Sequence, residues 1–157
     1  MGVEFALLVP AYNGGKLLEA TLRSCLAAGF DPARVAVIVC DNGSDDGSYE
    51  TALALAAGSG GLLRLHRNET NLGRVGNWNR CLERAEELGA AFGTFLMVGD
   101  EWLPEGDALA VTAAMAESGA SLALARYHIV GPDGRFQRVG RNFVRGDRQV
   151  VRAHEFV

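Results

Sequence analysis

Short apolar runs and segments with helical spacing alternate along this chain, and no other feature of the sequence constrains the fold as much. Each run is followed within two residues by proline, glycine or asparagine, which are strong turn formers. We predict strands at Phe5–Val9, Val35–Cys40, Leu62–His66, Thr94–Val98, Ser121–Val130 and Phe136–Val139. We predict helices from Lys16 to Gly29, from Ser48 to about Ala57, around Val75–Ala85 with Trp78 and Leu82 on the same apolar face, and from Pro104 towards Glu117. Successive strand–helix units imply parallel strands with right-handed crossovers, so we expect an α/β fold with a mainly parallel sheet and helices on both faces.

Length and composition limit the classes that remain. A chain of 157 residues with 48% apolar residues suits one compact domain over residues 1–157. The net charge of −4 argues against a nucleic-acid partner, and no uncharged stretch is long enough to cross a membrane. Three cysteines without metal or disulfide spacing indicate a reducing compartment, so we expect a cytoplasmic protein.

The end of the chain differs in charge from the rest. Residues 135–157 carry six arginines against Asp147 and Glu155, a net charge of +4. Such a basic tail can meet phosphate or a membrane surface, which would make the protein peripheral at a membrane, but a solvated loop is the simpler interpretation.

Polar residues follow the predicted strands at the point where each one ends. They form four groups: Pro10–Asn13, Asp41–Ser44, Asn68–Gly73 and Gly99–Glu101. Parallel sheets bind ligands at the carboxyl ends of their strands, so we expect these groups to form one rim. The chain has neither a P-loop nor a G-x-G-x-x-G sequence, which removes the usual supports for ATP hydrolysis and dinucleotide binding.

Two acidic positions of this rim have a functional and a structural interpretation. Asp41 can accept hydrogen bonds from a planar imide or a ribose hydroxyl, or it can form a local turn. The adjacent acids Asp100 and Glu101 can share a divalent cation with substrate phosphates, or they can belong to a solvated turn. Asp45 and Asp46 are interpreted as helix caps, as is Ser48.

The remaining polar candidates follow the third predicted strand. Gly73 allows the backbone to approach a ligand, and Arg74 at the start of a helix favours an anion, with Asn77 and Asn79 close by. The histidines show no metal spacing and are assigned structural or surface roles: His66, His128 and His154.

These motifs, in this order, resemble the family 2 glycosyltransferases, which have the GT-A fold. The resemblance rests on four stretches: Val9–Asn13, Val37–Ser48, Asn71–Gly73 with Asn79, and Phe95–Pro104. It covers nearly the whole chain, which resembles the amino-terminal, donor-binding portion of such an enzyme, with residues 135–157 leading towards an acceptor-binding region that lies further on.

The resemblance implies a site for a nucleotide sugar, usually a UDP-sugar, with Mn²⁺ or Mg²⁺ against the diphosphate. The nucleotide-binding residues would be Pro10, Ala11, Tyr12, Asn13, Asp41, Gly43, Ser44, Gly73, Arg74 and Asn79. The metal ligands would be Asp100 and Glu101. The chain departs from the family's D-x-D-D element, because Val98 stands in place of the first acid and Glu101 in place of the last.

The activity that follows from the resemblance is transfer of the sugar to an acceptor hydroxyl with inversion. The general base is expected beyond Val157, since Asp147 and Glu155 are the only late acids. Two alternatives stay open: a non-catalytic nucleotide-sugar-binding module or degenerate transferase, and a sugar-nucleotide nucleotidylyltransferase. The acceptor is a glycan, a lipid or a small molecule, and self-association is expected if apolar sheet surface is left uncovered.

Overall fold

The computed structural model describes residues 2–104, 106–121, 123, 128–131, 133 and 135–139. The strands are β1 Phe5–Ala11, β2 Val35–Asp41, β3 Leu63–Arg67, β4 Phe92–Phe95, β5 His128–Val130 and β6 Phe136–Val139. The helices are α1 Gly15–Ala27, α2 Ser48–Ala57, α3 Gly73–Glu87 and α4 Ala108–Ser118. The chain divides into two compact units, Met1–Leu109 and Ala110–Val157.

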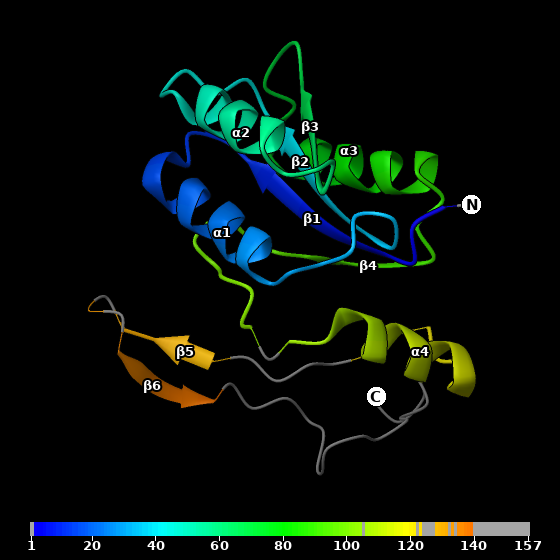
Figure 1. Cartoon of the computed structure of the whole chain (residues 1–157). Helices are drawn as coiled ribbons and strands as arrows, with labels where there is room; N and C mark the ends of the chain where they lie inside the picture. The colour runs from blue at the N-terminus through cyan, green and yellow to red at the C-terminus, as the bar shows by residue number, and fades with distance from the viewer. Residues whose placement is uncertain are drawn as a thin grey trace. The chain divides into compact units, whose positions relative to one another are not determined.

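The first unit contains a parallel sheet of four strands in the order β3-β2-β1-β4 (Figure 1). The chain moves outward from β1 to β3 and then returns to the other side of β1 to form β4. The strand order therefore reverses between β1 and β4. In open α/β sheets such a switch point leaves a crevice at the carboxyl ends of the strands, where ligands bind.

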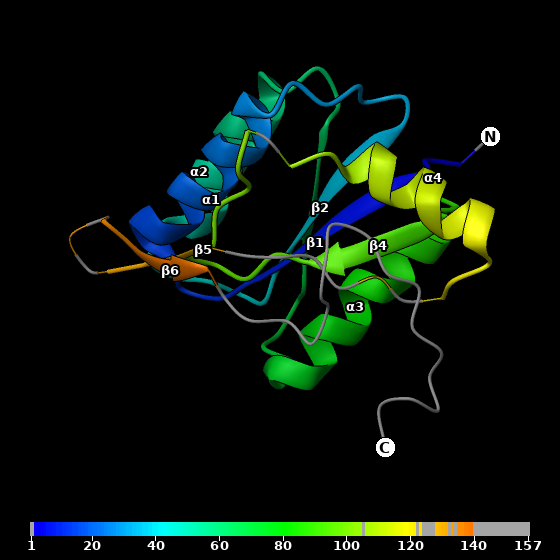
Figure 2. The same ribbon diagram turned by 90° about the horizontal axis from the view of Figure 1, so that it is seen from below.

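Helices cover both faces of this sheet (Figure 2). On one face, α1 and α2 pack against a cluster that includes Leu7, Val9, Val37 and Leu22. On the other face, α3 packs against a second cluster built around Leu8, Ile38 and Cys81. The side chains of β1 and those of β2 as far as Cys40 are apolar, as expected for parallel strands that are buried on both sides. The prediction of an α/β fold with helices on both faces is confirmed.

β1 is longer than predicted, because Pro10 lies inside the strand and does not end it. The backbone carbonyl of Leu8 accepts a hydrogen bond from Leu96 N–H on the β4 side, at 2.9 Å. Pro10, two residues later, faces the same side, but the pairing with β4 ends at Leu8 and Phe95. The missing proline N–H therefore costs the sheet no hydrogen bond.

The predicted apolar face of α3 is wrong in part. Val75 is 63% exposed and Leu82 50% exposed, whereas Asn77 and Cys81 are buried. The reason is a buried hydrogen bond: the Asn77 side-chain amide donates to the backbone carbonyl of Cys40, near the end of the central strand β2. That contact rotates the helix away from the orientation that apolar spacing alone predicts.

Two further boundaries differ from the prediction. The strand predicted at Thr94–Val98 runs instead from Phe92 to Phe95, because the chain then leaves the sheet to contact α1. The fourth helix begins at Ala108 and not at Pro104.

The second unit contains most of α4 and an antiparallel hairpin of β5 and β6, with His128 opposite Val139. The hairpin includes the predicted strand Phe136–Val139. Of the strand predicted at Ser121–Val130, only the last three residues form β5, and residues 122 and 124–127 lie outside the described residues, as does the basic tail from 140 to 157. No helix in the described part of the chain is long and apolar enough to cross a membrane.

Candidate functional site

The sheet register places the ends of three strands side by side. Ala11 pairs with Asp41, and Asp41 pairs with Arg67. Two backbone hydrogen bonds continue the ladder just beyond the strands, from Asn42 N–H to Ala11 O at 2.9 Å and from Asn68 N–H to Asp41 O at 2.8 Å. Three of the four predicted polar groups therefore meet at one edge of the sheet, as the sequence predicts.

Asp41 is the residue of this edge with an unsatisfied polar atom. Its side chain is 1% exposed. One carboxylate oxygen, Oδ2, accepts the backbone N–H of Ser44 at 3.1 Å and lies 3.4 Å from Arg67 Nε. The other oxygen, Oδ1, is buried and has no hydrogen-bond partner. A buried carboxylate oxygen without a hydrogen-bond donor lowers the stability of the folded protein, so this atom suits a ligand that supplies an N–H or O–H group.

Arg67 completes the environment of Asp41, and sequence reasoning missed it. Its guanidinium donates to the carbonyl oxygen of Ser44 at 2.8 Å and lies 4.5 Å from the centre of the Tyr49 ring. A weaker contact, at 3.9 Å, reaches Glu50. The available signal was its place at the end of the third predicted strand, in register with Asp41.

The loops after β1 and β2 are bound to each other. Asn13, at φ 48°, donates its backbone N–H to Ser44 Oγ at 2.9 Å and exchanges two further hydrogen bonds with Asp45. These contacts use the polar groups of Asn13 and Ser44, two predicted nucleotide-binding residues, to hold the two loops together. Their side chains therefore shape the rim.

Ser48 does not cap its own helix, contrary to the prediction. Its buried hydroxyl accepts the backbone N–H groups of Gly14 and Gly15, each at 2.9 Å, at the start of α1. Asp46 accepts the Ser48 N–H with one oxygen and the Gly15 N–H with the other, and the hydrogen bonds from Ser48 lower the pKa of Asp46. The N–H groups of Gly14 and Gly15 at the start of α1 are thus satisfied by Asp46 and Ser48, so these two groups are not available to a phosphate.

Four asparagines form a hydrogen-bonded network beneath the rim. Asn42 Oδ1 accepts Leu72 N–H and an amide hydrogen of Asn68, while Asn42 Nδ2 donates to Asn71 Oδ1. Asn68 also donates to Asn77, and Asn77 donates to Cys40 O at 2.9 Å. The network ties the start of α3 to the ends of β1 and β2. Sequence analysis pointed to Asn77 only as a neighbour of the anion position.

The structure brings Gly73 and Arg74 to this edge but not Asn79. Gly73, at φ 70°, donates its N–H to Asn71 Oδ1 and begins α3. Arg74 is exposed, with its guanidinium 5.5 Å from the Trp78 ring. Asn79 is exposed and lies about 200° around the helix from the buried Asn77.

The predicted residues nearest the switch point lie at the carboxyl end of β1 and directly after it. Tyr12 is 53% exposed at the end of this strand, and Pro10 is half-buried beside it. Ala11 is buried and contributes its backbone carbonyl, which accepts from Asn42. Gly43, at φ 79°, lies close to the backbone of Asn71, where a Cβ atom would stand 3.6 Å from the Asn71 nitrogen.

The acidic turn after β4 is held by side chains of α1. Thr21 and Ser24 of α1 hold the backbone of residues 99–102, and Asp100 and Glu101 are exposed. Within the part of the chain that the structure describes, neither carboxylate has a hydrogen-bond or ion-pair partner. Val98 is half-buried and packs against the core, where a carboxylate would lose part of its hydration.

The acidic turn can bind a metal ion only together with a ligand that supplies further oxygen atoms. Among the described residues no group of three or more histidine, cysteine or acidic side chains is placed to hold a metal ion. Mg²⁺ is commonly held by one or two carboxylates together with waters and substrate phosphates. The exposed pair fits that arrangement, with phosphate oxygens completing the coordination.

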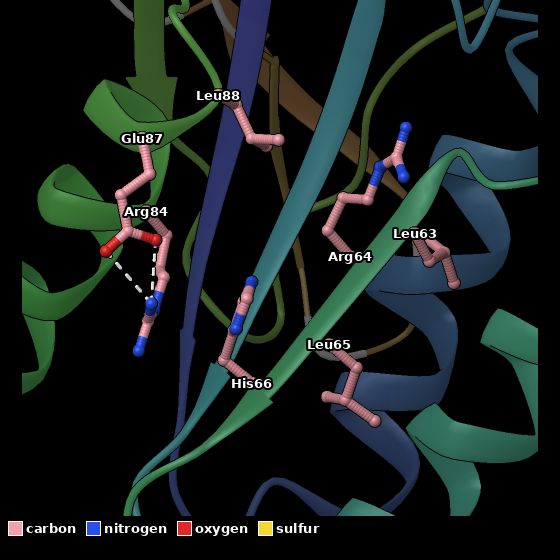
Figure 3. Close-up of a pocket in the computed structure, with 7 residues that line it drawn as sticks. All are labelled: Leu63, Arg64, Leu65, His66, Arg84, Glu87 and Leu88. Carbon is pink, nitrogen blue, oxygen red and sulfur yellow. Dashed lines mark hydrogen bonds and ion pairs between the residues drawn. The ribbon is translucent and has the colours of Figure 1, made fainter.

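A separate pocket of about 420 Å³ lies between β3 and α3 (Figure 3). His66 stands between the strand and the helix, whereas Leu63 and Leu65 lie on the opposite side of the strand. Burial lowers the pKa of His66, and Arg84 lowers it further. None of the predicted nucleotide-binding residues lines this pocket.

Comparison with known proteins identifies the family of this chain. The model of "Glycosyl transferase family 2" matches residues 6–154. The chain belongs to this family. A curated relative, glycosyltransferase AglD of Haloferax volcanii, is 37% identical over 87 residues, which are 54% of this chain and 14% of AglD.

Solved structures agree with the family 2 assignment. Residues 1–349 of S. aureus TarS, crystallised in complex with UDP and with UDP-GlcNAc, give a TM-score of 0.61 at 26% identity over 74% of this chain. The family 2 chain has the GT-A fold, as expected from its sequence. It spans only 32% of that TarS chain and a still smaller share of AglD.

Proposed function

We propose that this chain is the donor-binding portion of an inverting glycosyltransferase. It binds a nucleotide-diphospho-sugar, a UDP-sugar, together with Mn²⁺ or Mg²⁺, for transfer of the sugar to an acceptor hydroxyl. The observation that carries the proposal is the buried Oδ1 of Asp41, which has no partner at an edge of the sheet suited to ligands. The TarS complexes with UDP and UDP-GlcNAc support the choice of a uridine nucleotide.

Hydrogen-bond chemistry favours a base with an N–H group at Asp41. An ionised carboxylate only accepts hydrogen bonds, and uracil presents one imide N–H between two carbonyl groups. Tyr12, exposed at the end of β1, offers a ring on which a base can stack. Arg74 offers a cation for the diphosphate at the start of α3, where the helix dipole also favours negative charge.

The reaction we propose is a single displacement at the anomeric carbon. The acceptor oxygen forms a bond to that carbon while the bond to the diphosphate breaks, and a base takes the proton of the acceptor hydroxyl. Mn²⁺ or Mg²⁺ bound at Asp100 and Glu101 would stabilise the negative charge of the leaving diphosphate. Asp147 and Glu155 lie outside the described residues, and we assign the base to neither of them.

Calorimetric titration of UDP into the chain, with and without Mn²⁺, tests the proposal. Asp41→Asn keeps the shape of the side chain but removes its charge, and hydrogen bonds to charged groups are worth about 1.5–3 kcal/mol, so we expect UDP affinity to fall about 10-fold to 100-fold. The Mn²⁺ effect on the remaining binding should persist. Asp100→Asn should instead abolish the Mn²⁺ effect with little change in metal-free binding.

Asp31→Asn is a matched control, because Asp31 is an exposed carboxylate before β2, at the opposite edge of the sheet. It should change neither property. Absence of UDP binding by the unsubstituted chain in both conditions would refute the proposal.

A second function, binding without transfer, is favoured by one observation. Val98, in place of an acid, packs against the core beside Gly14, where an added Cβ would stand 2.9 Å from a Val98 methyl group. The metal site is thereby left with the single acidic pair Asp100–Glu101. Incubation with a UDP-sugar and Mn²⁺ separates the two functions: release of UDP supports the transferase, and stable binding without release supports the binding module.

A further inference from the structure

The turn that carries Asp100 is held by a buried hydroxyl of a distant helix. Thr21, in α1, is fully buried. Its Oγ1 accepts the backbone N–H of Gly99 at 3.0 Å and donates to the carbonyl oxygen of Asp100 at 2.7 Å. One side chain therefore satisfies two backbone groups of the acidic turn.

Ser24, one helical turn further on, extends this anchor. Its Oγ accepts the backbone N–H of Trp102 at 2.9 Å and donates to Thr21 O within the helix, at 2.7 Å. Ser24 thus follows the common pattern in which a helical hydroxyl returns to its own helix, whereas Thr21 directs both of its hydrogen bonds to the turn. The difference marks Thr21 as the principal contact between α1 and the turn.

The backbone of the turn is fixed while its acidic side chains face solvent. Gly99 has φ 98°, a conformation that favours glycine, and Asp100 N–H donates to Met97 O at 2.8 Å. Trp102 closes the turn by packing its ring edge-to-face on Phe30, at 5.6 Å between ring centres. The direction in which the Asp100 carboxylate leaves the backbone is therefore set by these contacts.

The same helix is bound at its start to the loop after β2. Ser48 Oγ accepts the N–H groups of Gly14 and Gly15, so α1 connects the loop that begins at Asp41 with the turn at Asp100. A ligand that spans both acids requires a constant separation between them. α1 supplies that separation because it is a rigid element bound at both points.

We propose that Thr21 is a positioning residue for the acidic turn: its hydroxyl sets the Asp100 carboxylate towards the cation that accompanies the diphosphate. This inference rests on the proposed function. Thr21 itself touches neither ligand nor metal. Groups that hydrogen-bond a metal-ligating side chain typically change metal affinity about 10-fold to 100-fold when they are replaced, and Thr21 acts on the backbone that carries such a ligand.

Three variants isolate the hydroxyl. Thr21→Val keeps the shape of the side chain but removes both hydrogen bonds to the turn, whereas Thr21→Ser retains a hydroxyl. Thr51→Val makes the same chemical change at a half-buried threonine of α2 and is the matched control. UDP and uridine are titrated calorimetrically into each chain with and without Mn²⁺, and hydrogen exchange is followed at the Gly99 amide.

We expect Thr21→Val to reduce the Mn²⁺ enhancement of UDP binding at least about 10-fold, with uridine affinity within about twofold of the unsubstituted chain. Exchange at Gly99 should accelerate. Thr21→Ser should restore the enhancement, and Thr51→Val should leave it unchanged. A purely structural role would instead weaken uridine and UDP alike.

Two further results would overturn the inference in distinguishable ways. If the unsubstituted chain binds UDP with Mn²⁺ enhancement and Thr21→Val retains that enhancement, the positioning role is wrong and the proposed function stands. If the unsubstituted chain does not bind UDP at all, the proposed function fails and the positioning role fails with it.

Discussion

Replacement of Asn77 by alanine should destabilise this protein far more than replacement of an ordinary polar residue on the surface of a helix. Asn77 is 3% exposed and joins α3 to the sheet. Its amide nitrogen donates to Cys40 O at 2.9 Å and to Ala11 O at 3.4 Å, and its oxygen accepts from Asn68 at 2.9 Å. Asn77→Ala removes all three contacts and leaves buried polar atoms without partners.

The magnitude follows from those contacts. Two of them have good geometry and contribute about 0.5–1.5 kcal/mol each, and a buried polar group left unpaired adds a penalty of about 1–3 kcal/mol. We therefore expect a loss of about 2–6 kcal/mol, a large part of the 5–15 kcal/mol that is typical of a domain. Urea unfolding followed by circular dichroism measures it, as a lower midpoint with an unchanged slope.

Asn79→Ala is the matched control, since it makes the same change two residues along the same helix at an exposed position. It should alter the free energy of unfolding by less than about 0.5 kcal/mol. Equal losses in the two variants would refute the argument that the Asn77 amide determines how α3 faces the sheet.

Three further predictions concern other buried or paired groups. Ser48→Ala removes the acceptor of two N–H groups at the start of α1 and should cost about 1–2 kcal/mol in urea unfolding; an unchanged midpoint would contradict this role. Burial raises the pKa of Cys25 from 9.0 to about 11, so the folded state holds the thiol proton more tightly than the unfolded state does. The stability that this thiol contributes is complete below pH 9 and is lost as the pH rises to 11. Cys25→Ala should therefore flatten the pH dependence of the free energy of unfolding between pH 9 and pH 11. Arg67→Met removes the cation 3.4 Å from Asp41 and should weaken UDP binding, measured by calorimetry, several-fold. Arg64→Met, at an exposed position of the same strand, should leave UDP affinity unchanged. Equal UDP affinities of the two variants would show that Arg67 has no part in the site.

Local pattern in the sequence accounts for most of the fold. The runs at Val35–Cys40 and Phe5–Val9 are strands because β-branched and apolar residues that are buried on both faces suit a parallel sheet, and their order determines the α/β class. Strand ends of a parallel sheet meet at one edge, so the convergence of Tyr12, Asp41 and Gly73 also followed from the sequence. Each of these features depends on neighbouring residues or on connectivity alone.

The partners of the polar residues followed only from the tertiary structure. Ser48 bonds to residues more than 30 positions away, and Thr21 bonds to a turn 78 and 79 positions away, distances over which a sequence pattern carries no signal. The same is true of Asn77, whose hydrogen bond to Cys40 outweighed the apolar spacing that predicted a different face for α3. Composition and periodicity thus determined which elements form and in what order, whereas the rotation of α3 and the pairing of buried polar groups depended on which backbone atoms packing brought within hydrogen-bonding distance.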